Sequence, residues 1–157
     1  MTDVADRLAD LERRVAALEA GEPAHPTPPT PDSAAGAVRY AGEVHLHGDV
    51  TWEIALDAGT ALGLDDEPRV AVLAALGHPA RARIVRSLLS GGPCGTAALQ
   101  ETAGLASTGQ LYHHLRSLTH SGLVEQDGRG SYRVNARAVV PVLVLLTAAA
   151  DVAGQLR

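Results

Sequence analysis

Residues 96–134 have the sequence TAALQETAGLASTGQLYHHLRSLTHSGLVEQDGRGSYRV, which predicts two helices separated by a tight turn. The first helix is expected over residues 96–103. Gly104 is expected to end it, because glycine readily adopts the left-handed conformation of a helix C-cap. The second helix is expected from about Ser107 to His120, where the following glycine stops it. This part of the chain therefore predicts a helix pair joined by a very short connection.

A short hairpin is expected directly after the second helix. Residues 123–125 and 131–134 have the character of strands, and the turn DGRG at 127–130 contains the glycines that tight hairpins favour. A short helix, a glycine turn, a second helix and a hairpin form a winged helix-turn-helix arrangement. In this arrangement the second helix enters the major groove of DNA, and the hairpin lies beside it as a basic wing that contacts the phosphate backbone or the minor groove.

The predicted second helix has one apolar and one polar face. Leu111, Leu115 and Leu118 follow the i, i+4, i+7 spacing of a buried stripe. On the polar side, Gln110 can hydrogen-bond to the edge of adenine and Arg116 can bind guanine or a phosphate. Together with two arginines of the wing, the residues expected to contact DNA are Thr108, Gly109, Gln110, Tyr112, His113, Arg116, Ser117, Arg129 and Arg133.

Three aromatic or imidazole side chains in this region allow more than one role. For His113, on the polar face, we favour DNA contact over simple solvation. His114 lies nearer the buried stripe and is expected to be packed and hydrogen-bonded. Tyr132 is expected to pack within the wing rather than to stack on a base.

Further helices are expected at 69–76, 79–90 and about 136–154. The last of these is apolar on more than one face, whereas a surface helix needs only one apolar stripe. The excess predicts burial against a twin subunit. The residues expected at this dimer interface are Trp52, Val139, Val142, Leu143 and Leu146.

Residues 38–57 alternate between apolar even positions and polar odd positions, which predicts a β-hairpin with a turn at 47–49. A two-stranded hairpin is unstable alone. Its apolar face must therefore cover either the C-terminal half of the chain or a partner subunit. His45 and His47 would share one strand face and could ligate a metal. Two histidines are only half of such a site, so we expect exposed strand histidines.

The first 37 residues differ in composition from the rest. Residues 3–20 carry valine and leucine at heptad spacing, which predicts a short amphipathic helix that pairs with another chain or frays. Five prolines within residues 21–37 predict an extended linker. The expected segments are thus the helix at 1–20, the linker at 21–37, the hairpin segment at 38–68 and the winged helix-turn-helix domain at 69–157. The fold class is mainly α with a small amount of β.

Several quoted segments resemble the ArsR-type winged helix-turn-helix regulators. They are LGHPARARI at 76–84, GL at 104–105, LYHHLRSL at 111–118 and SGLV at 121–124. The resemblance covers about residues 69–154. It implies a homodimer whose terminal helices pack together and which often acts as a repressor.

The chain departs from this family at its metal sites. Metal-sensing members carry a Cys-x-Cys pair on the first helix of the motif. Here Gly95 and Ala97 occupy those positions, and Cys94 lies one residue outside. The last helix also lacks histidine. We therefore expect no metal and no cofactor.

Charge is distributed unevenly along the chain. Residues 1–68 carry a net charge of −10 and residues 69–157 carry +5, which together give the total of −5. Only the C-terminal half is therefore expected to meet a polyanion.

The N-terminus lacks the pattern of a secretory signal and no apolar run is long enough to span a bilayer, so a cytoplasmic protein without membrane contact is expected. No phosphate loop, nucleophile motif or catalytic carboxylate pair indicates an enzyme.

These observations predict a sequence-specific regulator of transcription, most simply a repressor, that binds double-stranded DNA as a homodimer. Residues 3–20 could build a higher oligomer. The alternative is a protein–protein interaction module in which the acidic N-terminal half binds a partner and DNA binding is secondary. The sequence does not specify a small-molecule or protein effector.

Overall fold

The computed structural model describes residues 34–157, which belong to one compact unit. The predicted helix at 3–20 and most of the predicted linker at 21–37 lie outside the described residues. The elements follow in the order β1 (Ala37–Val44), β2 (Val50–Asp57), α2 (Ala58–Gly63), α3 (Asp66–Leu76), α4 (Pro79–Gly91), β3 (Cys94–Gly95), α5 (Thr96–Ala103), α6 (Thr108–His120), β4 (Val124–Gln126), β5 (Ser131–Val134), the 3-10 turn η1 (Ala136–Ala138) and α7 (Val139–Val152).

Strands β1 and β2 form the predicted antiparallel hairpin. Gly42 is paired with Trp52 and Val44 with Val50, so the even-numbered residues share one face, as the alternation predicts. The connecting loop spans 45–49 and is longer than the predicted turn. His45 therefore lies in a loop and not on a strand, and its Nδ1 is 2.7 Å from the Asp49 carboxylate.

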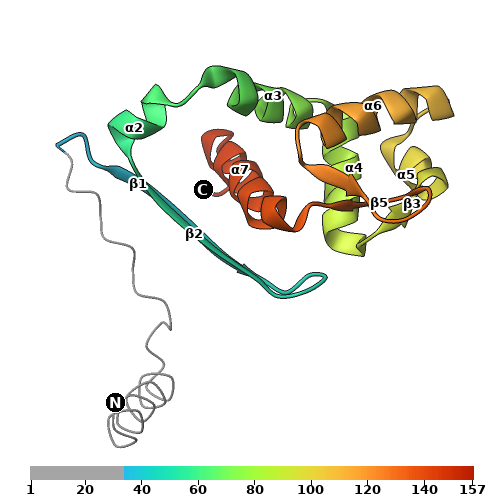
Figure 1. Ribbon diagram of the computed structural model, residues 1–157, viewed down its shortest axis with the longest axis horizontal. Helices are drawn as coiled ribbons and strands as arrows, with labels where there is room; N and C mark the ends of the chain where they lie inside the picture. Colours follow the sequence, from blue (N-terminus) through green and yellow to red (C-terminus); the bar gives the residue numbers. More distant parts are fainter. Residues whose placement is uncertain (1–33) are drawn as a thin grey trace, which may run out of the picture. The chain divides into compact units, whose positions relative to one another are not determined.

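The hairpin lies beside α7 (Figure 1), and its even-numbered face meets that helix at Gly42. The closest approach is at Gly42, where an added Cβ would lie only 2.7 Å from Cγ1 of Val140. Val140 is 1% exposed. The hairpin thus docks on the C-terminal half of its own chain, which is one of the two alternatives that its sequence left open.

Helix α2 follows β2 without a loop and was not predicted. Its six residues contain two glycines and carry no helical periodicity. The carboxylate of Asp57 caps its first turn by accepting a hydrogen bond from the N–H of Thr60 at 2.8 Å. In the same way Asp65 caps α3, which begins three residues earlier than predicted.

The core lies between α4, α5, α6, the small sheet and α7. Helix α4 starts with Pro79 in its first turn, and the ring Nδ1 of His78 accepts a hydrogen bond from the N–H of Ala80. The largest fully buried side chains are Ile84, Val85, Leu99, Leu111, Leu115, Leu118, Val140 and Val142. Across residues 34–157, no helix is long and apolar enough to cross a membrane.

Candidate nucleic-acid interface

Helices α5 and α6 form the predicted pair and are joined by a tight turn. Gly104 ends α5 in the left-handed conformation, with φ of 65°. The guanidinium of Arg83 on α4 donates a hydrogen bond of 2.8 Å to the carbonyl of Ala103, so the end of α5 is also held from outside the motif. At the other end, the N-cap of α5 is Gly95, and Thr96 is its first helical residue.

A small hydrogen-bond network fixes the turn between the two helices. Gln100 on α5 donates from Nε2 to the carbonyl of Leu105 at 3.3 Å. Its Oε1 accepts from the hydroxyl of Thr108, the first residue of α6, at 3.2 Å. The angle at which α6 leaves the turn is therefore set by one amide side chain that contacts both sides. Sequence reasoning identified neither Gln100 nor Arg83 as a positioning residue.

The start of α6 is capped by its own side chains. Ser107 accepts a hydrogen bond from the N–H of Gln110, and Oε1 of Gln110 accepts one from the N–H of Ala106 at 3.2 Å. This exchange resembles a capping box. The Gln110 carbonyl oxygen thus accepts one hydrogen bond from the backbone. An amide oxygen has two lone pairs, so this bond orients the side chain and still leaves one acceptor site and the amide donors for a base.

The two faces of α6 are as predicted. Leu111, Leu115 and Leu118 are at most 2% exposed and form the buried stripe. The opposite side carries the predicted DNA-facing residues, and Tyr112 is 50% exposed. The residues of this set that are exposed are Thr108, Gly109, Gln110, Tyr112, His113 and Arg116, whereas Ser117 is half-buried and its hydroxyl donates to the carbonyl of His113.

His114 is packed, as predicted, but one of its ring nitrogens has no hydrogen bond. Its ring centroid lies 4.6 Å from that of His78, and its Nδ1 is buried without a partner among the described residues. Burial lowers the pKa of His114, and the neighbouring charges of His78 and Arg81 lower it further. His114 therefore stays neutral in the folded protein near pH 7.

The wing consists of β4 and β5 and belongs to a three-stranded sheet in the order β3-β5-β4. Tyr132 on β5 is half-buried and packs against the core, as predicted. Arg129 lies exposed at the tip of the wing, between Gly128 and Gly130, which both have positive φ. Among residues 34–157, the guanidinium of Arg129 has no acidic partner within ion-pair distance, and the same holds for Arg116 on α6.

Arg133 has a different environment from Arg129. It lies opposite Glu125 in the register of β4 and β5, and its Nε is 2.7 Å from that carboxylate. Asp127 lies 3.6 Å from the same guanidinium, and Glu125 raises the pKa of Arg133. The wing from 124 to 134 therefore carries two arginines and two carboxylates. Its net charge is zero, so the expectation of a basic wing is wrong.

The residues predicted for the dimer interface divide into two groups. Val142 is fully buried in the core of its own protomer and has no area to offer a partner. Val139, Leu143 and Leu146 are half-buried against that core, and Trp52 is half-buried on the hairpin. Val70 and Leu73 on α3, which sequence reasoning did not single out, are 53% and 54% exposed.

No group of three or more potential metal-ligating side chains occurs among the described residues. His47, the predicted strand neighbour of His45, lies instead in the hairpin loop and packs its ring over Gly92. Cys94 lies half-buried on β3.

Residues 76–127, which include α4, α5, α6 and the first strand of the wing, match a protein-family model described as a helix-turn-helix domain. The fold is a winged helix-turn-helix. The matched region corresponds to the part of the chain in which the sequence resembles the ArsR-type regulators. No curated protein matches the chain.

Two solved structures are similar to this winged helix-turn-helix. One is the domain of Mb0332 from Mycobacterium bovis, described as a homodimeric winged helix-turn-helix DNA-binding domain and a possible ArsR-family transcriptional regulator. It is 24% identical, with a TM-score of 0.47, and the match covers 57% of this chain and 89% of that one. The other is HlyU from Vibrio cholerae, at 23% identity and a TM-score of 0.44, with 58% and 94% covered.

Proposed function

We propose that the protein is a sequence-specific DNA-binding regulator of transcription that acts as a homodimer. The observation that carries this proposal is the state of α6. Its apolar stripe is completely buried, while Tyr112, His113 and Arg116 remain exposed on the opposite side. The turn before it is fixed by Gln100 and Arg83. A rigidly held helix with an exposed polar face is what insertion into a major groove requires.

The charges that would bind phosphate support the same proposal. Arg116 on α6 and Arg129 at the wing tip have no acidic partner among residues 34–157, so each is available to a phosphate at no cost in broken ion pairs. Arg133 would first have to leave Glu125. We therefore assign the main phosphate contacts to Arg116 and Arg129, with Arg133 in a secondary role.

DNA binding is tested by selecting genomic fragments on the full-length protein and measuring their affinity by fluorescence anisotropy at several salt concentrations. Arg116→Ala should weaken binding and reduce the slope of log K against log salt by about one unit, because one phosphate contact is lost. Arg157→Ala is the matched control, since Arg157 lies at the end of the chain beside Asp151. Equal slopes for the wild type and Arg116→Ala would remove α6 from the interface.

The homodimer is supported by apolar side chains that the protomer leaves exposed. Val70 and Leu73 lie on α3, and Val152 at the end of α7 is 91% exposed. Val70 and Leu73 are three residues apart on one helix, so they lie on one side of it and offer a partner a short apolar stripe. A second copy is the partner that a two-fold DNA-binding module requires, because paired recognition helices read half-sites about one helical turn apart.

Light scattering after gel filtration tests the dimer. The wild type should have twice the mass of the chain, and Leu73→Glu should shift it toward monomer because a charge at the interface must be desolvated. Val38→Glu in the hairpin is the control, since it adds the same charge at a similarly exposed apolar residue. A monomeric wild type would contradict the proposal.

Repression is the finer part of the proposal and rests on the resemblance to ArsR-type regulators. A reporter gene placed behind a selected fragment should become more active when the protein is absent. A reporter that loses activity under the same condition would indicate an activator.

A further inference from the structure

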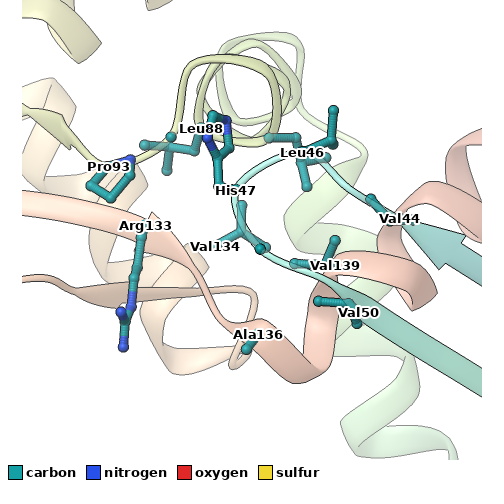
Figure 2. A pocket seen from close by; sticks show the side chains of 13 residues that line it. Val44, Leu46, His47, Val50, Leu88, Pro93, Arg133, Val134, Ala136 and Val139 are labelled. Atoms are coloured by element: carbon teal, nitrogen blue, oxygen red, sulfur yellow. The ribbon is translucent and has the colours of Figure 1, made fainter.

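A small cavity lies where the loop of the hairpin reaches the base of the wing (Figure 2). Its volume is about 200 Å³. Its walls come from four elements that are far apart in the chain: the hairpin, the end of α4, β5 and the start of α7. The aliphatic side chains that line it include Val44, Val50, Leu88, Leu89, Val134 and Val139.

Two glycine contacts hold the hairpin over this cavity. At one side Gly42 lies against Val140, as described above. At the other side the ring of His47 packs over Gly92, where an added Cβ would lie 3.1 Å from the ring Nδ1. Gly92 also has φ of 78°, a conformation that favours glycine. The cavity is therefore partly open: α4, β5, α7 and the ends of the two hairpin strands form its walls, and residues 46–48 of the hairpin loop, held at Gly92, form one side.

Apolar surface predominates in the lining, although part of it is polar. Arg133 contributes only the stem of its side chain, because its guanidinium is bound to Glu125 and Asp127. Figure 2 shows this guanidinium turned away from His47 and Leu88. The imidazole of His47 is the polar side-chain group that remains at the rim. A charged ligand would thus lose its hydration without gaining an unpaired counter-charge, whereas an uncharged one loses little hydration by entering.

We propose that this cavity is a binding site for a small uncharged apolar molecule, of the size of a single ring, with at most one polar group that His47 can meet. The volume agrees with this class, since an apolar cavity of about 150 Å³ in another protein stays dry and binds benzene. Larger drug-sized ligands occupy about 300–1,000 Å³ and would not fit.

The site has a consequence for DNA binding that rests on the function proposed above. A molecule in the cavity contacts the hairpin, α4, β5 and α7 together. It therefore stabilises one arrangement of the hairpin relative to the winged helix-turn-helix, and it alters DNA affinity if the DNA-bound dimer prefers another arrangement. The cavity would then be the effector site of the regulator.

Binding is tested on the full-length protein with toluene as the probe and methyl NMR as the readout. Toluene should shift the methyl signals of Val44, Val50, Leu88, Leu89, Val134 and Val139 in a saturable manner. The methyls of Leu111 and Leu115 in the core, and those of Val70 and Leu73 on the exposed face of α3, should not move. Shifts spread over the α3 methyls as well, or no saturable shifts at all, would overturn the proposal.

Filling the cavity provides the matched variant. Val50→Phe should abolish the saturable shifts, whereas Val38→Phe, the same substitution on the same face at the far end of the hairpin, should leave them unchanged. Ala136→Leu is a second filling variant at an exposed position of the lining and replaces Val50→Phe if that protein does not fold. Retained binding in a folded filling variant would also overturn the site.

The effect on DNA is measured separately. Toluene should change the affinity for a selected fragment by about fivefold or more in the wild type and not in the filling variant. If the protein binds no DNA, the proposed function fails while the NMR result still decides the site. If it binds DNA and the saturated site has no effect on affinity, the effector role is refuted.

Discussion

Replacing Gly42 by alanine tests whether the hairpin is an integral part of the domain. The new Cβ would lie 2.7 Å from Cγ1 and 3.5 Å from Cγ2 of Val140. Val140 cannot easily yield, because a β-branched side chain in a helix has one strongly preferred rotamer and this one is buried. Overpacking of this kind costs about 1–3 kcal/mol. For a chain of 157 residues, each kcal/mol lowers Tm by about 2–4 °C.

The assay is urea unfolding followed by the emission of Trp52, the single tryptophan, which lies opposite Gly42 in the hairpin. Gly63→Ala is the control. An added Cβ there meets nothing within 4 Å, so the substitution should be neutral or stabilising by up to about 1 kcal/mol. In a double-mutant cycle, Val140→Ala should relieve part of the cost of Gly42→Ala. If Gly42→Ala is as stable as the control, the hairpin does not pack on α7 as described.

Three further predictions concern the wing, the thiol and the pH dependence of stability. Arg129→Ala should lower the salt slope of DNA binding by about one unit, while Arg133→Ala should leave it near the wild-type value because its guanidinium is already bound to a carboxylate; anisotropy titrations measure both. Cys94→Ser should bind DNA as the wild type does, and zinc or arsenite should release neither protein; metal-driven release that depends on the thiol would contradict this. His114 has a pKa below its ordinary value of about 6.5 in the folded protein, so the unfolded chain binds more protons and the free energy of unfolding falls as the pH drops below about 6.5. His114→Leu should remove this part of the slope between about pH 7.5 and 5.5 in urea titrations, and an unchanged slope would show that another group is responsible.

Elements with strong local periodicity could be predicted from the sequence. The buried stripe of α6 and the even-numbered face of the hairpin both follow directly from residue spacing. The structure confirms the stripe and the shared face, although Val38 and Ile54 on that face stay exposed. Gly104 also ends α5 as predicted. In contrast, α2 has no apolar periodicity that would predict a helix. Its N-cap is Asp57, the last residue of β2. Strand β3 has two residues and exists only through its pairing with β5.

The exposed face of the candidate site could be predicted from the sequence, but the ion pair of Arg133 and the burial of Val142 could not. The exposed face of α6 follows from the helical wheel. The state of Arg133 depends on the register of the wing, which places Glu125 directly opposite. A turn at 127–130 would have allowed this register to be derived. The burial of Val142 depends on how α7 is rotated against α4 and the hairpin, and an all-apolar helix gives no local signal for that rotation.

Strand β5 lies in the centre of its sheet and pairs with both β4 and β3, so it joins the wing to the start of α5. Ser131 on β5 pairs with Gly95, and the N–H of Thr96 donates to the carbonyl of Gly130 at the wing turn. A displacement of the wing tip would therefore also displace the start of α5. Through the hydrogen bond between Gln100 and Thr108, it would displace α6 as well. A signal that changes DNA affinity is thus expected to move α5, α6 and the wing together. In the homodimer proposed above, such a signal would then change the distance and angle between the two motifs, and not the internal geometry of either one.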